Sequence, residues 1–147
     1  MTIRAYEPAD LGAVAVIWLS GWESTGVMAP GTSGTVTDLA KRLPVEIAGG
    51  WAVYVADVGG EVVGFCALAG DKLKQLFVTP IYQGRGLGKA LLDFVKQARP
   101  DGFTLSTAVN SRAWAFYERE GLVRIGEKAH VRFGFPMYRY AWPSHRP

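Results

Sequence analysis

The stretch from residue 76 to residue 92 constrains the fold more than any other part of the chain. It reads LFVTPIYQGRGLGKALL, which is an apolar run, a glycine-rich turn and the start of an amphipathic sequence. The apolar run predicts a buried strand, and the leucines beyond the glycines recur at the spacing of one helix face. The first turn of a helix has unpaired backbone N–H groups that bind anions. The stretch therefore predicts an α/β fold with a phosphate site at this turn, or a glycine-rich connection without a ligand.

The spacing of the glycines excludes two familiar phosphate loops. Gly84, Gly86 and Gly88 have no Cβ atoms and allow a positive φ, so a ligand can approach the main chain closely. A Walker A loop would need a glycine at Gln83 and a hydroxyl side chain at Ala90. The dinucleotide fingerprint also fails, because no glycine lies three residues after either Gly-x-Gly pair.

The loop Gln83-Gly84-Arg85-Gly86-Leu87-Gly88 follows a strand and a Val-x-Pro step, and it resembles the acyl-coenzyme A loop of the GNAT superfamily of N-acetyltransferases. The resemblance implies that backbone N–H groups from Gln83 to Lys89 hold the pyrophosphate of acetyl-coenzyme A, and that Arg85 or Lys89 adds charge. It also implies that the backbone of Phe77 and Val78 binds the pantetheine arm as if it were an added strand. The cofactor-binding residues expected in this motif are Phe77, Val78, Gln83, Gly84, Arg85, Gly86, Leu87, Gly88 and Lys89.

A second motif lies at residues 110–122, which read NSRAWAFYEREGL. It resembles the family pattern Asn-x-x-Ala-x-x-Phe-Tyr-x-x-x-Gly-Phe, with Leu122 in place of the last Phe. The resemblance adds Asn110, Ala113, Phe116 and Tyr117 to the cofactor-binding residues, with the Asn110 side chain near the pantetheine and the Tyr117 hydroxyl near the thioester sulfur. Asn110 as a helix N-cap and Tyr117 as a core residue are the alternatives.

The chemistry of acetyl transfer fits a tyrosine at this position. An amine that attacks a thioester expels a thiolate, and a phenol with an ordinary pKa of about 10 is still protonated at neutral pH. We therefore expect Tyr117 to be the general acid. The base is less well defined: many members of the family carry a Glu on the fourth strand, but Lys72 stands near that position here. Glu23, Asp71 and a water chain ending on a backbone carbonyl are the candidates.

The acceptor pocket is expected around the first helix and the loop after it. Trp18, Trp22 and Glu23 are the expected substrate-binding residues, and Met28 and the loop as far as Val36 should border the pocket, because this segment covers the cleft in the family. Trp18 as a core residue is the alternative.

The remaining pattern predicts a mixed, mainly antiparallel sheet flanked by helices, in the order β-α-α-β-β-β-α-β-α-β-β. Strands are expected at 2–6, 51–58, 61–69, 72–79, 103–109, 122–128 and 137–142, and helices at 8–21, 35–48, 86–98 and 111–120. Pro44 is expected to kink or shorten the second helix. This order resembles the GNAT fold over the whole chain, and the resemblance implies that the fourth and fifth strands splay apart.

Composition narrows the class of protein. A length of 147 residues with 49% hydrophobic and 20% charged residues predicts a single globular domain over 1–147. The net charge of +3 suits an anionic cofactor as well as nucleic acid. The run 132–142 mixes basic and aromatic residues, as an RNA-binding segment does, but its alternation favours a strand, so we do not expect nucleic acid as a partner.

Cysteine and histidine are too few for a disulfide or a usual zinc site, so we expect no metal. Cys66 lies in an apolar segment and is expected to be a buried structural thiol. The longest apolar run, 13–19, is too short for a membrane span, and residues 1–7 lack the pattern of a secretory signal, so we expect a cytoplasmic protein.

These observations favour an N-acetyltransferase that moves an acetyl group from acetyl-coenzyme A to a primary amine by direct attack. A non-catalytic acyl-coenzyme A sensor is the alternative, motivated by the missing Glu on the fourth strand. The acceptor and the formation of a homodimer stay open.

Overall fold

The computed structural model describes residues 1–26 and 34–143, and its centre is a seven-stranded sheet in the order β1-β2-β3-β4-β5-β7-β6. Neighbouring strands are antiparallel except β4 and β5, which are parallel. The strands are β1 (Thr2–Ala5), β2 (Ala52–Val58), β3 (Glu61–Ala69), β4 (Lys72–Val78), β5 (Phe103–Ala108), β6 (Val123–Ala129) and β7 (Pro136–Trp142). The α-helices are α1 (Leu11–Ser24), α2 (Val36–Ala48), α3 (Leu87–Ala98) and α4 (Ala113–Arg119), with short 3₁₀ helices η1 (Pro8–Asp10) and η2 (Pro80–Tyr82). The predicted fold class and element order are confirmed.

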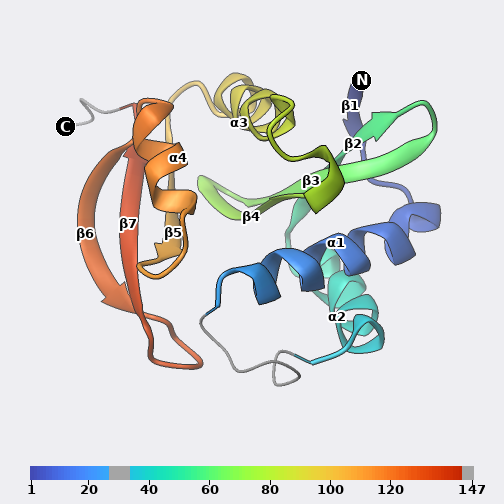
Figure 1. Cartoon of the computed structure of the whole chain (residues 1–147), viewed down its shortest axis with the longest axis horizontal. Coiled ribbons are helices and arrows are strands. Elements are labelled where there is room, and N and C mark those ends of the chain that lie inside the picture. The colour runs from blue at the N-terminus through green and yellow to red at the C-terminus, as the bar shows by residue number, and fades with distance from the viewer. Residues whose placement is uncertain (27–33, 144–147) are drawn as a thin grey trace.

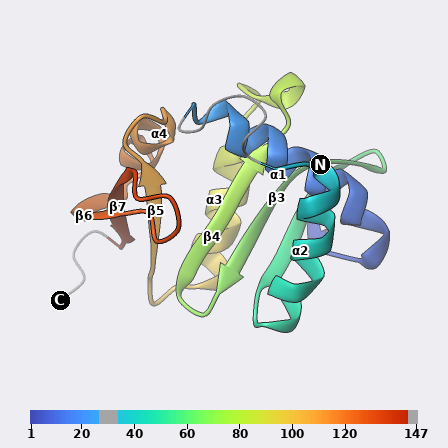
Figure 2. The ribbon, with the colours of Figure 1, turned by 90° about the horizontal axis from the view of Figure 1, so that it is seen from below.

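The helices cover the two faces of the sheet and create a core on each (Figures 1 and 2). Helices α1 and α2 lie against one face of β2, β3 and β4, where Leu43 and Phe65 are fully buried. Helix α3 lies against the other face, where Leu91 and Leu92 are fully buried beside Cys66. Burial of a Leu or Phe side chain contributes about 1.5–3 kcal/mol, so these two clusters hold the helices to the sheet.

Strands β4 and β5 are joined only at their first residues. Their pairing consists of Lys72 with Thr104 and Leu73 with Leu105, whereas β3 and β4 pair from Lys72 to Val78. Figure 2 shows the two strands diverging beyond this junction. The splay implied by the family resemblance is confirmed, and it leaves one edge of β4 without a strand partner beyond Leu73.

A β-bulge in β4 lies beside the junction. Leu73 pairs with Leu68 and Gln75 pairs with Ala67, so Lys74 is the extra residue between them. A bulge of this kind reverses the alternation of side chains along the strand. The face on which each later residue of β4 lies therefore depends on Lys74.

Two helices differ from the prediction. Helix α1 continues to Ser24 and therefore carries Trp22 on its last turn. Pro44 does not shorten α2, which runs on to Ala48. A capping box fixes the start of α2, with the Asp38 N–H 3.1 Å from the Thr35 hydroxyl, and the fully buried Leu43 holds the helix to the core beside the proline.

Cys66 is a free thiol at the centre of β3 with no exposed surface. Burial raises the pKa of its thiol to about 12, so the nucleophilic thiolate is absent at neutral pH. The expected structural role of Cys66 is confirmed. Among the described helices, none has the length and apolar character needed to cross a membrane.

Candidate functional site

The turn before α3 presents a continuous run of free backbone donors. Gly84 and Gly86 both have a φ of 79°, in the left-handed region, and Gly86 is the N-cap of α3. Gln83 N–H donates to the Pro80 carbonyl and Ala90 N–H donates to the Gly86 carbonyl, at 3.2 and 3.0 Å. Within the described residues, the six N–H groups from Gly84 to Lys89 between them donate to no acceptor. Such a run at a helix N-terminus suits an anion with several oxygens.

The two cations predicted at this turn differ in what they contact. The Lys89 ammonium pairs with Asp93 at 3.3 Å and with Glu120 at 3.0 Å, and these partners raise the pKa of Lys89. The Arg85 guanidinium lies 5.0 Å from the centre of the Tyr82 ring and has no carboxylate partner among the described residues. Arg85 is therefore the better placed of the two to pair with a phosphate.

The free edge of β4 is formed by Leu76 and Val78. Thr79 N–H donates to the Val63 carbonyl on β3 at 2.8 Å, and main-chain groups alternate in direction along a strand, so those of Phe77 also point to β3. The Phe77 ring packs on α1, in the space that a Cβ on Gly21 would fill. The Phe77 backbone, which was predicted to bind pantetheine, is therefore turned towards β3, and the main-chain groups at the free edge are those of Leu76 and Val78.

Gln83 supports the end of this edge. Its side-chain Nε2 donates to the Val78 carbonyl at 3.1 Å, which links the glycine turn to the last residue of β4. The role of this side chain is therefore to hold the turn against the strand, and the run of free donors begins at the next residue, Gly84.

Tyr117 lies on α4 with 7% of its surface exposed, and its ring is 5.3 Å from Phe116 and 6.4 Å from Tyr140. Within the described residues its hydroxyl makes no hydrogen bond, and no side-chain oxygen or nitrogen is both fully buried and unpaired. The hydroxyl therefore has an open side. Burial, together with the nearby Cys66, raises the pKa of Tyr117, so the phenol is a donor at neutral pH.

The second motif meets the first where α4 approaches the start of α3. A Cβ on Gly88 would stand 3.7 Å from the Phe116 ring, which is ordinary contact. Ala113 is half-buried against the same core as Tyr117. Asn110 is exposed and is not the N-cap of α4: that position is Arg112, and the Ala113 N–H donates to the Ser111 hydroxyl at 3.1 Å. The side chain of Asn110 is left available for a ligand.

Four aromatic residues connect the end of α1 to the segment between β6 and β7. The Trp22 ring lies 5.8 Å from His130, 6.2 Å from Phe133 and 5.8 Å from Phe135. We call these four residues the aromatic cluster. Of these, only Trp22 was predicted as a site residue. The aromatic residues of the run 132–142 were the available signal for the others, but their partner lies in α1, far away in the sequence.

Trp18 belongs to the core. It is 3% exposed, and its ring lies 5.6 Å from Trp51 and 6.5 Å from Phe65. Trp18 is therefore a core residue, which was the alternative left open by the sequence, and its side chain offers almost no surface to a substrate. Met28 and its neighbours in 27–33 lie outside the described residues.

The base candidates stay exposed. Glu23 follows Trp22 on the last turn of α1 and its carboxylate has no partner among the described residues, and Asp71 is exposed in the turn before β4. Lys72 lies where β4 and β5 are still paired, so the opening between these strands begins beyond it.

His130 is unsuited to act as a base, although it belongs to the aromatic cluster beside Trp22. Its Nδ1 accepts the N–H groups of Arg132 and Phe133, both at 3.1 Å. Burial, and then the charges of Lys128, Arg132 and Arg42, lower the pKa of His130, so the ring is neutral with its proton on Nε2. Neither ring nitrogen then has a free lone pair.

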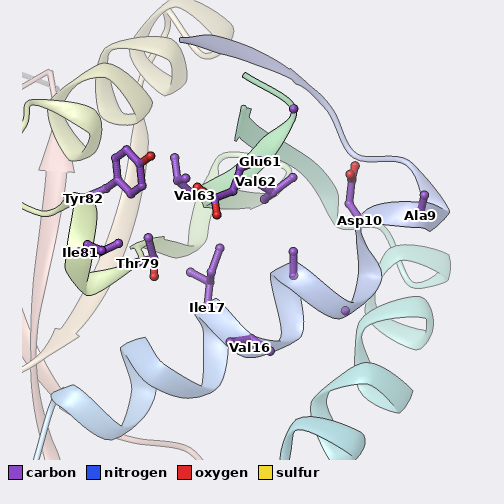
Figure 3. Close-up of a pocket in the computed structure, with 13 residues that line it drawn as sticks. Ala9, Asp10, Val16, Ile17, Glu61, Val62, Val63, Thr79, Ile81 and Tyr82 are labelled. Carbon is purple, nitrogen blue, oxygen red and sulfur yellow. The ribbon is translucent and has the colours of Figure 1, made fainter. Parts of the chain in front are cut away.

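A separate hollow of about 520 Å³ lies between α1, the start of β3 and η2 (Figure 3). Val16 and Ile17 line one side, and Glu61, Thr79 and Tyr82 line the other. None of its lining residues comes from β5, α4 or β7. The hollow is therefore distinct from the opening between β4 and β5, and its lining reaches η2 at Tyr82 but includes no residue of the glycine turn.

Comparisons with known proteins agree with this geometry. Residues 49–123, just over half of the chain, match the model of the acetyltransferase (GNAT) domain. The chain is 26% identical over 136 residues to the probable N-acetyltransferase Rv2775 of Mycobacterium tuberculosis, covering 80% of this chain and 77% of that protein. It is 26% identical over 144 residues to the peptidyl-lysine N-acetyltransferase YiaC of Escherichia coli, covering 96% of each.

Among solved structures, yncA from Salmonella typhimurium with its cofactor acetyl-CoA has the same fold. The TM-score is 0.74 at 18% sequence identity, over 100% of this chain and 95% of that one. The family model covers β2 to the start of β6, the part of the chain that holds the free donors, the β4 edge and Tyr117. The chain belongs to the GNAT family of acetyltransferases.

Proposed function

We propose that this protein transfers an acetyl group from acetyl-coenzyme A to a primary amine by direct attack, with Tyr117 as the proton donor to the leaving thiolate. The observation that carries the proposal is the run of six free N–H groups from Gly84 to Lys89, which continues into the unpaired edge of β4. A pyrophosphate needs the first feature and a pantetheine arm with two amides needs the second. Their order along the chain matches the order of these groups in coenzyme A.

Different parts of the protein are proposed to bind different parts of acetyl-coenzyme A. Backbone N–H groups of the glycine turn hold the pyrophosphate, and Arg85 adds a charge-assisted contact. Leu76 and Val78 pair with the pantetheine amides along the β4 edge, and the exposed Asn110 amide reaches the arm from the β5 side. This arrangement places the thioester near the Tyr117 hydroxyl.

In the transfer step, the neutral amine nitrogen attacks the thioester carbonyl, a C–N bond forms and the C–S bond breaks. The Tyr117 hydroxyl donates a hydrogen bond to the sulfur as negative charge develops there. Its raised pKa makes complete proton transfer to the thiolate uphill, so the phenol is deprotonated only briefly. The proton released by the acetylated nitrogen restores the phenol through solvent. Glu23, the exposed carboxylate beside Trp22, accepts the proton that the substrate ammonium loses before attack.

The test is release of free thiol from acetyl-coenzyme A, measured with and without an amine. Tyr117→Phe should lower kcat by about 100-fold or more, the usual worth of a general acid, with coenzyme A affinity nearly unchanged. Tyr138→Phe is the matched control, because Tyr138 is half-buried on the same α4 side and, like Tyr117, its hydroxyl makes no hydrogen bond within the described residues. Full activity in Tyr117→Phe would remove the assigned role.

A sensor of acyl-coenzyme A is the second candidate, favoured by the absence of a carboxylate along β4. Binding of acetyl-coenzyme A with no amine-dependent thiol release, across amines, amino acids and lysine peptides, would support the sensor. The name of the relative YiaC makes a peptide lysine one acceptor to include.

A further inference from the structure

The face of β7 that is turned towards α1 carries an arginine without a partner. Arg4, Arg99 and Arg139 are the half-buried arginines of the described residues. Arg4 pairs with Asp10 and Asp57, and Arg99 donates to the Gly70 and Ala98 carbonyls. Arg139 makes no ion pair, hydrogen bond or ring contact with any described residue. A half-buried guanidinium has five N–H donors to satisfy, so a free one suggests a ligand.

The strand pairings fix the direction of this side chain. Met137 and Arg139 lie on one face of β7, and Phe135, which directly precedes the strand two positions before Met137, contacts Trp22 at the end of α1. The opposite face carries Tyr138 and Tyr140, which pack with α4. Arg139 therefore lies on the side from which α1 and the aromatic cluster border the opening.

The same pairings place Arg139 beside the opening. Ser106 of β5 pairs with Arg139 and so shares its face. Ser106 directly follows Leu105, the last β5 residue that pairs with β4. Neighbouring strands are about 4.8 Å apart, so the Arg139 side chain begins about one strand spacing from β5, at the level where the opening between β4 and β5 starts. The proposed acetyl transfer occurs in this opening.

The charged side chains that share the face of Arg139 are positive, like Arg139 itself. Lys128 pairs with Met137 and shares the face of Arg139, while Glu127 pairs with Tyr138 and lies on the other face. Among residues of β5, β6 and β7, this face therefore carries cations and no carboxylate. It disfavours a polycationic acceptor and attracts an anionic one.

We propose that Arg139 is a specificity-determining residue that binds a carboxylate of the acceptor, so the substrates are amino acids or similar amines with a carboxylate, with an apolar group placed against the aromatic cluster. This inference rests on the proposed acetyl transfer. A planar guanidinium holds a carboxylate by two parallel hydrogen bonds, which orients the amine as well as binding it.

The test compares L-phenylalanine with L-phenylalaninamide, spermidine and a lysine peptide in the thiol-release assay. The wild-type protein should have a higher kcat/KM for the acid than for the amide, and Arg139→Gln should lower the value for the acid roughly 10- to 100-fold, the worth of hydrogen bonds to a charged group, with little change for the amide. In Arg139→Lys, the kcat/KM for the acid should lie between the values of the wild-type protein and Arg139→Gln. Lys41→Gln, the same charge change on the exposed surface of α2, should alter neither value.

Three results would overturn the inference: preference for the amide or the amines in wild type, equal losses for acid and amide in Arg139→Gln, or weakened coenzyme A binding in that variant. Thermal unfolding checks that each variant is folded. If no acceptor releases thiol, acetyl transfer itself fails. Calorimetric titration of L-phenylalanine into the coenzyme A complex then decides: binding to wild type that Arg139→Gln abolishes supports the carboxylate site, and any other result rejects it.

Discussion

Gly86 offers the sharpest test of the donor site, because a single methyl group probes the backbone there without filling space. Its φ of 79° lies in the left-handed region, and a Cβ at this position would meet no atom within 4 Å. Gly86→Ala therefore adds neither charge nor clash. It acts only through the conformation of the turn whose N–H groups are proposed to hold the pyrophosphate.

The size of the effect expected from Gly86→Ala can be judged by comparison with the same substitution at Gly59. A residue other than glycine pays about 1–2 kcal/mol in the left-handed region. Gly59, in the turn between β2 and β3, has a φ of 60° and also has no atom within 4 Å of its Cβ position, so Gly59→Ala should cost a similar free energy of unfolding. At Gly86 the turn can relieve this strain only by rotating its N–H groups. Each lost hydrogen bond to a charged phosphate costs about 1.5–3 kcal/mol, or roughly 10- to 100-fold in Kd.

Two measurements separate the effects. Urea denaturation should show a loss of about 1–2 kcal/mol in both variants. Titration calorimetry with coenzyme A should show weaker binding, by roughly 10- to 100-fold, in Gly86→Ala and wild-type affinity in Gly59→Ala. Unchanged affinity in Gly86→Ala, or an equal loss in Gly59→Ala, would refute the assignment of this turn to the pyrophosphate.

Two further predictions concern the acceptor side and acid stability. Trp22→Ala removes the ring that joins α1 to the aromatic cluster, so the KM of an aromatic acceptor should rise by more than the KM of acetyl-coenzyme A; equal changes in steady-state kinetics would count against an acceptor role. Arg4 donates to Asp10 at 2.9 and 3.0 Å and holds the carboxyl pKa below its ordinary value, so this stabilisation is present at neutral pH and is lost as pH falls below about 4. Asp10→Asn should flatten the acid limb of urea-denaturation stability against pH, and an unchanged limb would contradict this linkage.

The parts of the site that sequence predicts correctly are local in the chain. The positive φ of Gly84 and Gly86 follows from two glycines next to a helix start, and the capping box at Thr35 follows from residues three apart. The proximity of Gly88 to Phe116 comes from two motifs whose order and spacing resemble one family. The first two features are encoded by neighbouring residues, and the third by two motifs that are each local in the chain.

The features that sequence misses depend on register or on contacts between distant segments. The bulge at Lys74 sets which main-chain groups of β4 face the opening, those of Leu76 and Val78 rather than of Phe77, and no residue type marks that bulge. The Lys89 ammonium pairs with Glu120, which directly follows α4 and lies far from Lys89 in the sequence. Arg139 can be recognised as a candidate site residue only when β7 is known to lie beside β5 with one face towards α1.

This difference follows from what each half of the site is made of. The proposed donor half consists of main-chain groups of the glycine turn and of the β4 edge, so it needs glycines and an unpaired strand but few particular side chains. The proposed acceptor half consists of side chains from the end of α1, from the β6–β7 segment and from β7, which meet only in the folded protein. If these assignments hold, substitutions at Trp22 or Arg139 should change the acceptor, while the glycine turn and Tyr117 still act on the same thioester. Relatives that share both motifs are for this reason expected to differ in acceptor, and the side chains facing α1 are where that difference should be sought.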